Sequence, residues 1–252
     1  MLLIKQDKFG EADEITLQAA HGRHVHFVHA IEGIATPFLK LSAQLPFAAY
    51  CFQTTPDMPN HSIEIMAERY IKTMRAHQPN GPYHLAGYSY GACIAYEMAC
   101  QLQSVGVRCQ LALIDGSHHY MQTYRKVYRE AFGIATDNIV DNPLFETELL
   151  LAFAERVSTA IKYDEARRTL LALKDWPARV AEVARSVMAS GGVFANVDLF
   201  TRSCDALRQR FLAADNYRPE HRYAGDVSLL RAQQGAGKEA DVGDDYGLKA
   251  VS

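Results

Sequence analysis

The order of the segments constrains the fold most, because short apolar runs alternate with amphipathic helical patterns along the first half of the chain. Runs typical of β-strands lie at residues 24–29, 50–53, 83–87 and 109–114. Helical spacing of apolar residues begins after Ser62, a residue type that caps helices, and returns at 92–105. Strands that alternate with helices in this way favour a parallel sheet with helices on its faces.

The alternation then stops. Residues 118–215, about 98 positions, have almost wholly helical patterns, and one further strand is expected at 227–231. Helix starts within this block are marked by Asn142-Pro143, Asp164, Trp176-Pro177 and Asp198. The sequence therefore predicts an α/β fold with a mostly parallel, doubly wound sheet. Residues 1–117 and 216–252 form its core, and 118–215 form a helical lid insertion.

Composition excludes several classes of protein. The chain is 48% hydrophobic and 22% charged, as expected for a globular protein, and no apolar run approaches the roughly 20 residues of a membrane span. A net charge of −3 with no Lys/Arg cluster does not indicate a nucleic-acid partner. Five scattered cysteines without a CxxC motif favour a reducing, cytoplasmic compartment, and no metal or nucleotide site is expected.

The motif Gly87-Tyr88-Ser89-Tyr90-Gly91 matches G-x-S-x-G and lies between a predicted strand and a predicted helix. This is the setting of a nucleophile elbow, in which the serine is held at a sharp, strained turn. The residues two before and two after the serine crowd each other, and here both are glycine. Ser89 is therefore the predicted nucleophile. A glycine-rich turn without chemistry is the alternative.

Asp115 ends the next predicted strand. A right-handed crossover makes the strands 83–87 and 109–114 parallel, so both end at the same edge of the sheet, about 4.8 Å apart if they are neighbours. A carboxylate at that position can orient a histidine and stabilise its protonated form. The alternative role is a cap for the turn at Gly116-Ser117.

An oxyanion hole needs two backbone amides. One is expected from Tyr90, which follows the nucleophile, and the other from the loop 29–33 after an early strand, where Ile31 is the best candidate. Tyr88 either lines the site or only packs. Both interpretations are open from the residues alone.

Four segments in collinear order carry a resemblance to a known family. They are FVHAIEG (27–33), QPNGPYHLAGYSYGACIAYEMACQLQ (78–103), LIDGS (113–117) and YAGDVSLLRA (223–232). Together they resemble the thioesterase domain of animal-type fatty acid synthase. The resemblance implies an α/β-hydrolase core with a helical insertion. It also implies the site roles: Ser89 as nucleophile, Asp115 as triad acid, Ile31 and Tyr90 as oxyanion donors, and Tyr120 and Tyr124 near the acyl group.

The implied activity is hydrolysis of a long-chain fatty acyl thioester on acyl carrier protein, releasing free fatty acid through an acyl-serine intermediate. No cofactor would bind directly, since the acyl group is carried on the phosphopantetheine arm of a carrier domain in the same parent polypeptide. Neither a membrane nor nucleic acid is implied as a partner. The helical insertion would supply an apolar groove, although its apolar residues at helical spacing also fit an ordinary core.

The catalytic histidine of that family lies in a Gly-Asp-His type loop beyond the last matched strand, and the sequence ends at Ser252 before such a loop. Of the histidines after Asp115, His221 is expected at the opposite sheet edge, and His118 and His119 begin the insertion. The expectation is therefore a truncated chain with little turnover, because an unaided serine is a poor nucleophile. The alternatives are a freestanding serine hydrolase acting on other thioesters or esters, and a non-catalytic hydrolase-fold scaffold.

Overall fold

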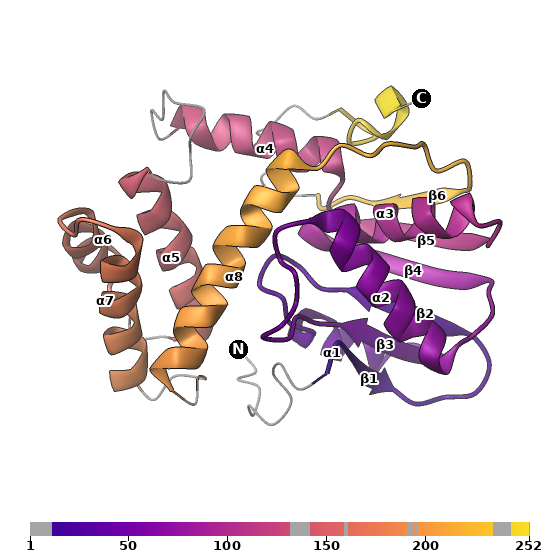
Figure 1. Cartoon of the computed structure of the whole chain (residues 1–252), viewed down its shortest axis with the longest axis horizontal. Coiled ribbons are helices and arrows are strands. Elements are labelled where there is room, and N and C mark those ends of the chain that lie inside the picture. The colour runs from indigo at the N-terminus through magenta and orange to yellow at the C-terminus, as the bar shows by residue number, and fades with distance from the viewer. Residues whose placement is uncertain are drawn as a thin grey trace. The chain divides into compact units, whose positions relative to one another are not determined.

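The computed structural model describes residues 12–131, 142–158, 161–190, 194, 196–233 and 243–251. These residues form two compact units (Figure 1). One consists of the described residues within 9–127 and 210–252 and contains the sheet. The other consists of the described residues within 128–209 and is helical. The predicted limits of the insertion, 118–215, stay a prediction.

The first unit is built on a six-stranded sheet in the order β1-β3-β2-β4-β5-β6. The strands are β1 (Glu14–Gln18), β2 (His24–Val28), β3 (Ala48–Phe52), β4 (Tyr83–Tyr88), β5 (Cys109–Ile114) and β6 (Val227–Leu230). All neighbouring pairs are parallel except β1 with β3, which is antiparallel. The predicted parallel α/β sheet is confirmed, with each predicted strand within two residues of its expected bounds. The edge strand β1 was not predicted from the sequence.

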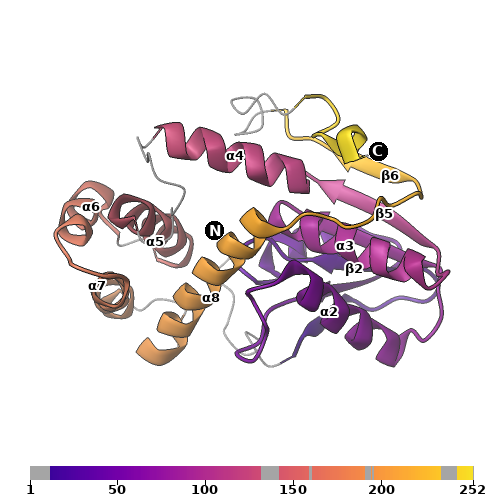
Figure 2. The same ribbon diagram turned by 45° about the horizontal axis from the view of Figure 1, so that its top comes forward.

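A hydrophobic core packs against each face of the sheet. Helices α2 (Ile63–His77) and α3 (Tyr90–Ser104) lie side by side on one face, as Figures 1 and 2 show. Successive strand residues point to opposite faces: in β4, Leu85 packs into the core beneath these helices and Ala86 into the core of the other face. The second core also contains Phe38, from the short 3-10 helix η1 (Thr36–Phe38) that leads into α1 (Leu39–Ser42).

The limits of the core helices follow from their capping residues. Ser62 caps α2 as predicted, since its Oγ accepts a hydrogen bond from Ile65 N at 3.2 Å. Helix α3 begins two residues earlier than predicted because Ser89 itself is the residue before its first turn. The helix ends before Gly106, which has φ +75°.

The helical unit contains α5 (Pro143–Val157), α6 (Tyr163–Leu171), α7 (Trp176–Ala189) and the first part of α8 (Val197–Asn216). Helix α4 (His118–Ala131) begins in the sheet unit. Asn142 caps α5 as predicted. The expected cap at Asp164 is wrong: α6 begins at Tyr163, and Asp164 lies in its first turn, where a negative charge favours the helix N-terminus. No helix in the described ranges is long and apolar enough to cross a bilayer.

A buried ion pair and a set of enclosed apolar side chains hold the helical unit together. Arg179 Nη1 donates to Glu146 Oε2 at 2.7 Å, and its other nitrogens donate to two backbone carbonyls near the end of α6. The apolar residues expected either in an acyl groove or in an ordinary core include several that are fully enclosed here, namely Leu150, Leu151, Phe153 and Phe200. These four residues therefore belong to the core of the unit.

Candidate active site

Ser89 lies at the turn between β4 and α3. Its backbone has φ 52° and ψ −118°, a conformation that costs a non-glycine residue about 1–3 kcal/mol. Its N–H donates to Ile114 O at 2.9 Å, so the strained turn is held by the end of β5. Ser89 is half-buried and lies at the N-terminus of a 15-residue helix, where the first amides have no partner within the helix.

Glycine is required on both sides of this serine. A Cβ on Gly87 would lie 2.3 Å from Gly91 O, and one on Gly91 would lie 2.3 Å from His29 O and 2.4 Å from Val28 O. A Cβ on Gly116 would lie 2.3 Å from Ser89 O. All of these contacts are to backbone atoms, which cannot rotate away. The crowding argument made from the G-x-S-x-G spacing is therefore confirmed by the geometry.

Asp115 follows the strand beside β4. Tyr88 and Ile114 are register partners in the parallel pair β4–β5, so Ser89 and Asp115 each come directly after paired residues at the same sheet edge. The predicted adjacency of these strands is confirmed. Asp115 has φ 48°, and its N–H donates to Leu230 O at 2.7 Å. Two strained, non-glycine residues therefore lie together at the ends of neighbouring strands.

The Asp115 carboxylate is bound by a tyrosine. Tyr246 Oη donates to Asp115 Oδ1 at 2.7 Å, and Ala232 N approaches the same oxygen at 3.3 Å. Tyr246 is buried and stacks on Tyr120, with ring centroids 4.9 Å apart. Burial first, and then the hydrogen bond to Asp115, raise the pKa of Tyr246 to about 12, so the phenol stays a donor. In the described ranges no histidine hydrogen-bonds to Asp115.

Two histidines at the start of α4 are engaged elsewhere. His118 is buried against the rings of Tyr96 and Tyr217, and burial lowers its pKa to about 4. His119 lies against Gly247, so close that a Cβ on that glycine would be 2.3 Å from its ring. His221 is exposed.

The loop after β2 is anchored by a buried arginine that sequence reasoning missed. Arg210 Nε donates to Ile31 O at 2.7 Å, and its Nη1 donates to Asn60 Oδ1 at 2.7 Å. Arg210 is only 1% exposed. Gly33, with φ +78°, closes the turn by donating to Ala30 O at 3.0 Å. No sequence signal links Arg210 to a loop 179 residues earlier in the chain.

His29 fills a polar position inside the core. Its Nδ1 lies 2.6 Å from Ala30 O and its Nε2 2.7 Å from Tyr70 Oη. Burial first, and then the charge of Arg210, lower the pKa of His29 to about 3, so the imidazole is neutral near pH 7. Because a carbonyl only accepts hydrogen bonds, Nδ1 carries the proton and Nε2 accepts from the tyrosine. His29 is therefore a core residue whose two ring nitrogens are both hydrogen-bonded.

The predicted tyrosines differ in their environments. Tyr90 is buried, and its amide lies at the first position of α3. Tyr88 is half-buried and meets Phe38 edge to face. Tyr120 is buried and stacked on another tyrosine, and the side chain of Tyr124 lies outside the described residues. The acyl-binding and oxyanion roles expected for these residues and for Ile31 remain predictions.

Replacing Arg210 with methionine is expected to lower the free energy of unfolding by about 3 kcal/mol, because Ile31 O and Asn60 Oδ1 would lose a buried charged donor. We also expect covalent labelling of Ser89, the predicted nucleophile, by a fluorophosphonate probe to slow at least about tenfold as the loop loses its anchor. Urea unfolding and adduct formation measure the two effects. Arg202→Met, on the exposed face of the same helix, should change stability by no more than about 0.5 kcal/mol. Equal effects of the two replacements would contradict the anchoring role.

The parallel sheet with a strained serine between strand and helix defines an α/β-hydrolase-like protein. Within that class, the family model of the thioesterase domain matches residues 23–245, which is most of the chain. The chain therefore belongs to the thioesterase domain family.

Curated relatives match the chain over short stretches. The chain is 46% identical over 65 residues to the polyketide synthase PksR of Bacillus subtilis (strain 168), which is 25% of the chain and 3% of the relative. It is 45% identical over 69 residues to indigoidine synthase of Dickeya dadantii (strain 3937), or 27% of the chain and 5% of the relative. The chain thus spans only a small part of the length of these relatives.

Solved structures show the same fold. A four-domain nonribosomal peptide synthetase bound to AMP and glycine matches 95% of the chain and 18% of that protein, with 21% identity and a TM-score of 0.71. The NocB thioesterase domain in covalent complex with a fluorophosphonate nocardicin G analogue matches 86% of the chain and 77% of that domain, with 21% identity and a TM-score of 0.54. At these identities the likeness concerns the fold alone.

Proposed function

We propose that this domain cleaves an acyl thioester carried on the phosphopantetheine arm of a carrier protein, through an acyl-serine at Ser89. The observation that carries the proposal is the strained serine at the start of α3, beside Asp115 on the next strand, in a chain of the thioesterase family. The synthases and synthetases named among the relatives support a carrier-bound substrate and a carrier domain in the same polypeptide.

The proposed reaction has two steps. Ser89 Oγ attacks the thioester carbonyl, the C–S bond breaks, and the pantetheine thiol leaves with a proton. Water then attacks the acyl-serine and releases the acid. The amides of Tyr90 and Ile31 are the proposed donors to the oxyanion, and the N-terminus of α3 adds favourable electrostatic potential there. Acylation and hydrolysis both require a base that accepts the serine or water proton.

We further propose that the 252-residue chain turns over slowly. Tyr246 Oη donates to Asp115 Oδ1, and none of the described residues places a histidine at this carboxylate. Loss of the histidine costs a serine protease about 10⁶-fold in turnover. The proposed outcome is therefore slow acylation by activated thioesters and very slow release.

A long-chain fatty acyl group is the proposed substrate, because the segments 27–33, 78–103, 113–117 and 223–232 resemble fatty acid synthase thioesterases. A freestanding hydrolase for other thioesters or esters is the second candidate, and a binding scaffold the third. The proposed location is the cytoplasm, since all five cysteines are free and buried.

A panel of acyl thioesters tests the proposal. The chain is incubated with short-, medium- and long-chain acyl-pantetheine and with the matching ethyl esters, and acyl adducts are followed by intact mass. We expect the long-chain pantetheine thioester to acylate the chain fastest. Equal rates for thioesters and ethyl esters would favour the second candidate. Failure of every substrate, and of a fluorophosphonate probe, to modify Ser89 would favour the scaffold.

A further inference from the structure

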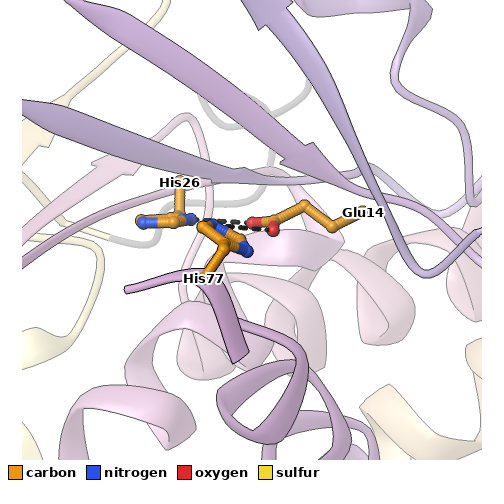
Figure 3. Close-up of side chains that lie close together, drawn as sticks. All are labelled: Glu14, His26 and His77. Carbon is orange, nitrogen blue, oxygen red and sulfur yellow. Dashed lines mark hydrogen bonds and ion pairs between the residues drawn. The ribbon is translucent and has the colours of Figure 1, made fainter. Parts of the chain in front are cut away.

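Three side chains that the proposed reaction does not use meet at another part of the sheet unit (Figure 3). Glu14 comes from β1, His26 from β2, and His77 is the last residue of α2. Their nearest oxygen and nitrogen atoms all lie within 4.8 Å of one another. These three residues are too far apart in the sequence to form a recognisable metal-ligand motif, so no metal site was predicted from the sequence.

The carboxylate of Glu14 contacts both imidazoles from one side (Figure 3). Its Oε1 is 2.7 Å from His26 Nδ1, and its Oε2 is 3.2 Å from His77 Nε2. The side chains of Glu14 and His26 are 5% and 0% exposed, whereas that of His77 is 36% exposed. The cluster is therefore closed on the sheet side and open to solvent beside the end of α2.

His26 faces an oxygen at each ring nitrogen. Its Nε2 lies 2.9 Å from Gln78 Oε1, and the amide nitrogen of Gln78 points to the carbonyls of Asn80 and Pro82, each at 3.4 Å. A neutral imidazole has one N–H, and Gln78 Oε1 can take it. The lone pair of Nδ1 then faces the Glu14 carboxylate at 2.7 Å. In this tautomer two lone pairs face each other, an arrangement that a cation between them, either a proton or a metal ion, would stabilise.

We propose that this cluster binds a divalent transition-metal ion, best fitted by Zn²⁺, through His26 Nδ1, His77 Nε2 and the Glu14 carboxylate. Two imidazoles and one carboxylate are an established zinc ligand set, with a fourth position left for water. The contact from His26 Nε2 to Gln78 is the outer hydrogen bond that usually orients a ligating histidine. The exposed edge of His77 provides a path for the ion and its water.

Binding requires the ligand atoms, which now lie within 4.8 Å of one another, to adjust. Zinc ligands at about 2.0–2.1 Å in a tetrahedral arrangement lie about 3.3 Å apart. The His77–Glu14 distance of 3.2 Å already matches, and the His26–Glu14 distance of 2.7 Å would open by about 0.6 Å on binding. The half-exposed His77 ring at the helix end can move to meet the ion.

The expected role of the ion is structural. His77 ends α2, and the chain then passes to the start of β4 at Tyr83, whereas Ser89 follows the other end of that strand. The ion would link β1, β2 and α2. A second link lies beside it, because Arg69 Nε of α2 donates to Oδ2 of Asp13, the residue before Glu14, at 2.7 Å. Metal binding should therefore change stability without changing acylation of Ser89.

The test is a zinc titration of the tag-free, 252-residue chain, by calorimetry and by thermal unfolding. We expect one Zn²⁺ per chain and a rise in Tm of about 5–10 °C at a free zinc concentration 100 times Kd, reversed by EDTA. Cobalt should give the visible absorption bands of a tetrahedral Co²⁺ site. His77→Gln should weaken zinc binding at least about tenfold, and Glu14→Gln should do the same.

The matched control is His61→Gln, which removes an exposed histidine at the start of the α2 segment and should leave zinc affinity unchanged. Because His77 is half-exposed, its variant should fold even if Glu14→Gln does not. Absence of saturable zinc binding would overturn the proposal. Binding of equal affinity in the parent chain and in His77→Gln would overturn it as well.

Discussion

Replacing Ser89 with alanine is expected to abolish covalent labelling of the chain by a fluorophosphonate probe, a loss of at least about 100-fold, because the hydroxyl is the proposed nucleophile. Labelling is measured by intact mass over a long incubation, since the 252-residue chain is proposed to react slowly.

Ser104→Ala is the matched control for this experiment. Ser104 is an exposed serine at the other end of α3, and its Oγ only donates to Gln101 O at 2.7 Å. The control should label at the rate of the parent chain. Undiminished labelling of Ser89→Ala would show that the reactive group is another residue of the chain.

Gly91→Ala is expected to lower the free energy of unfolding by at least about 3 kcal/mol. The added Cβ would lie 2.3 Å from His29 O and 2.4 Å from Val28 O, so α3 and the end of β2 would have to separate. Urea unfolding with circular dichroism measures the loss. Labelling of Ser89 should fall as well, since the same shift moves the proposed oxyanion loop.

Gly106→Ala is the control for this prediction, because it introduces backbone strain without crowding. Gly106 has φ +75°, and no atom lies within 4 Å of the position that an added Cβ would take. Alanine there therefore costs only its left-handed conformation, about 1–2 kcal/mol. If Gly91→Ala lowers the free energy of unfolding by no more than Gly106→Ala does, the structure relieves the crowding around the serine turn at little cost.

Much of the sheet unit can be predicted from the sequence because its central strands are rich in apolar residues. Strands such as β4 and β5 are nearly continuous apolar runs bounded by turn residues, and the crossover rule makes them parallel. The edge strand β1, Glu14–Gln18, is half-buried, and its residues alternate between polar and apolar instead of forming an apolar run. The start of α6 was misplaced because Asp164 is favourable both as a cap and within a first turn.

The candidate site was likewise predictable from the sequence only in part. Ser89 and Asp115 could be placed from local pattern, since each directly follows a recognisable strand. The contacts of Arg210 with Ile31 and of Tyr246 with Asp115 join residues 179 and 131 positions apart, and no periodicity or motif encodes such pairs. Tertiary packing alone determines them.

The central claim is that Ser89 accepts the acyl group, and peptide mapping after incubation with a long-chain acyl-pantetheine thioester tests it most directly. We predict that the acyl group is found on the peptide that contains Ser89. The cysteines are poor competitors, because burial raises the pKa of Cys93 and Cys100 to about 12 and that of Cys109 to about 11. An acyl group located on any other residue, with Ser89 unmodified, would contradict the account.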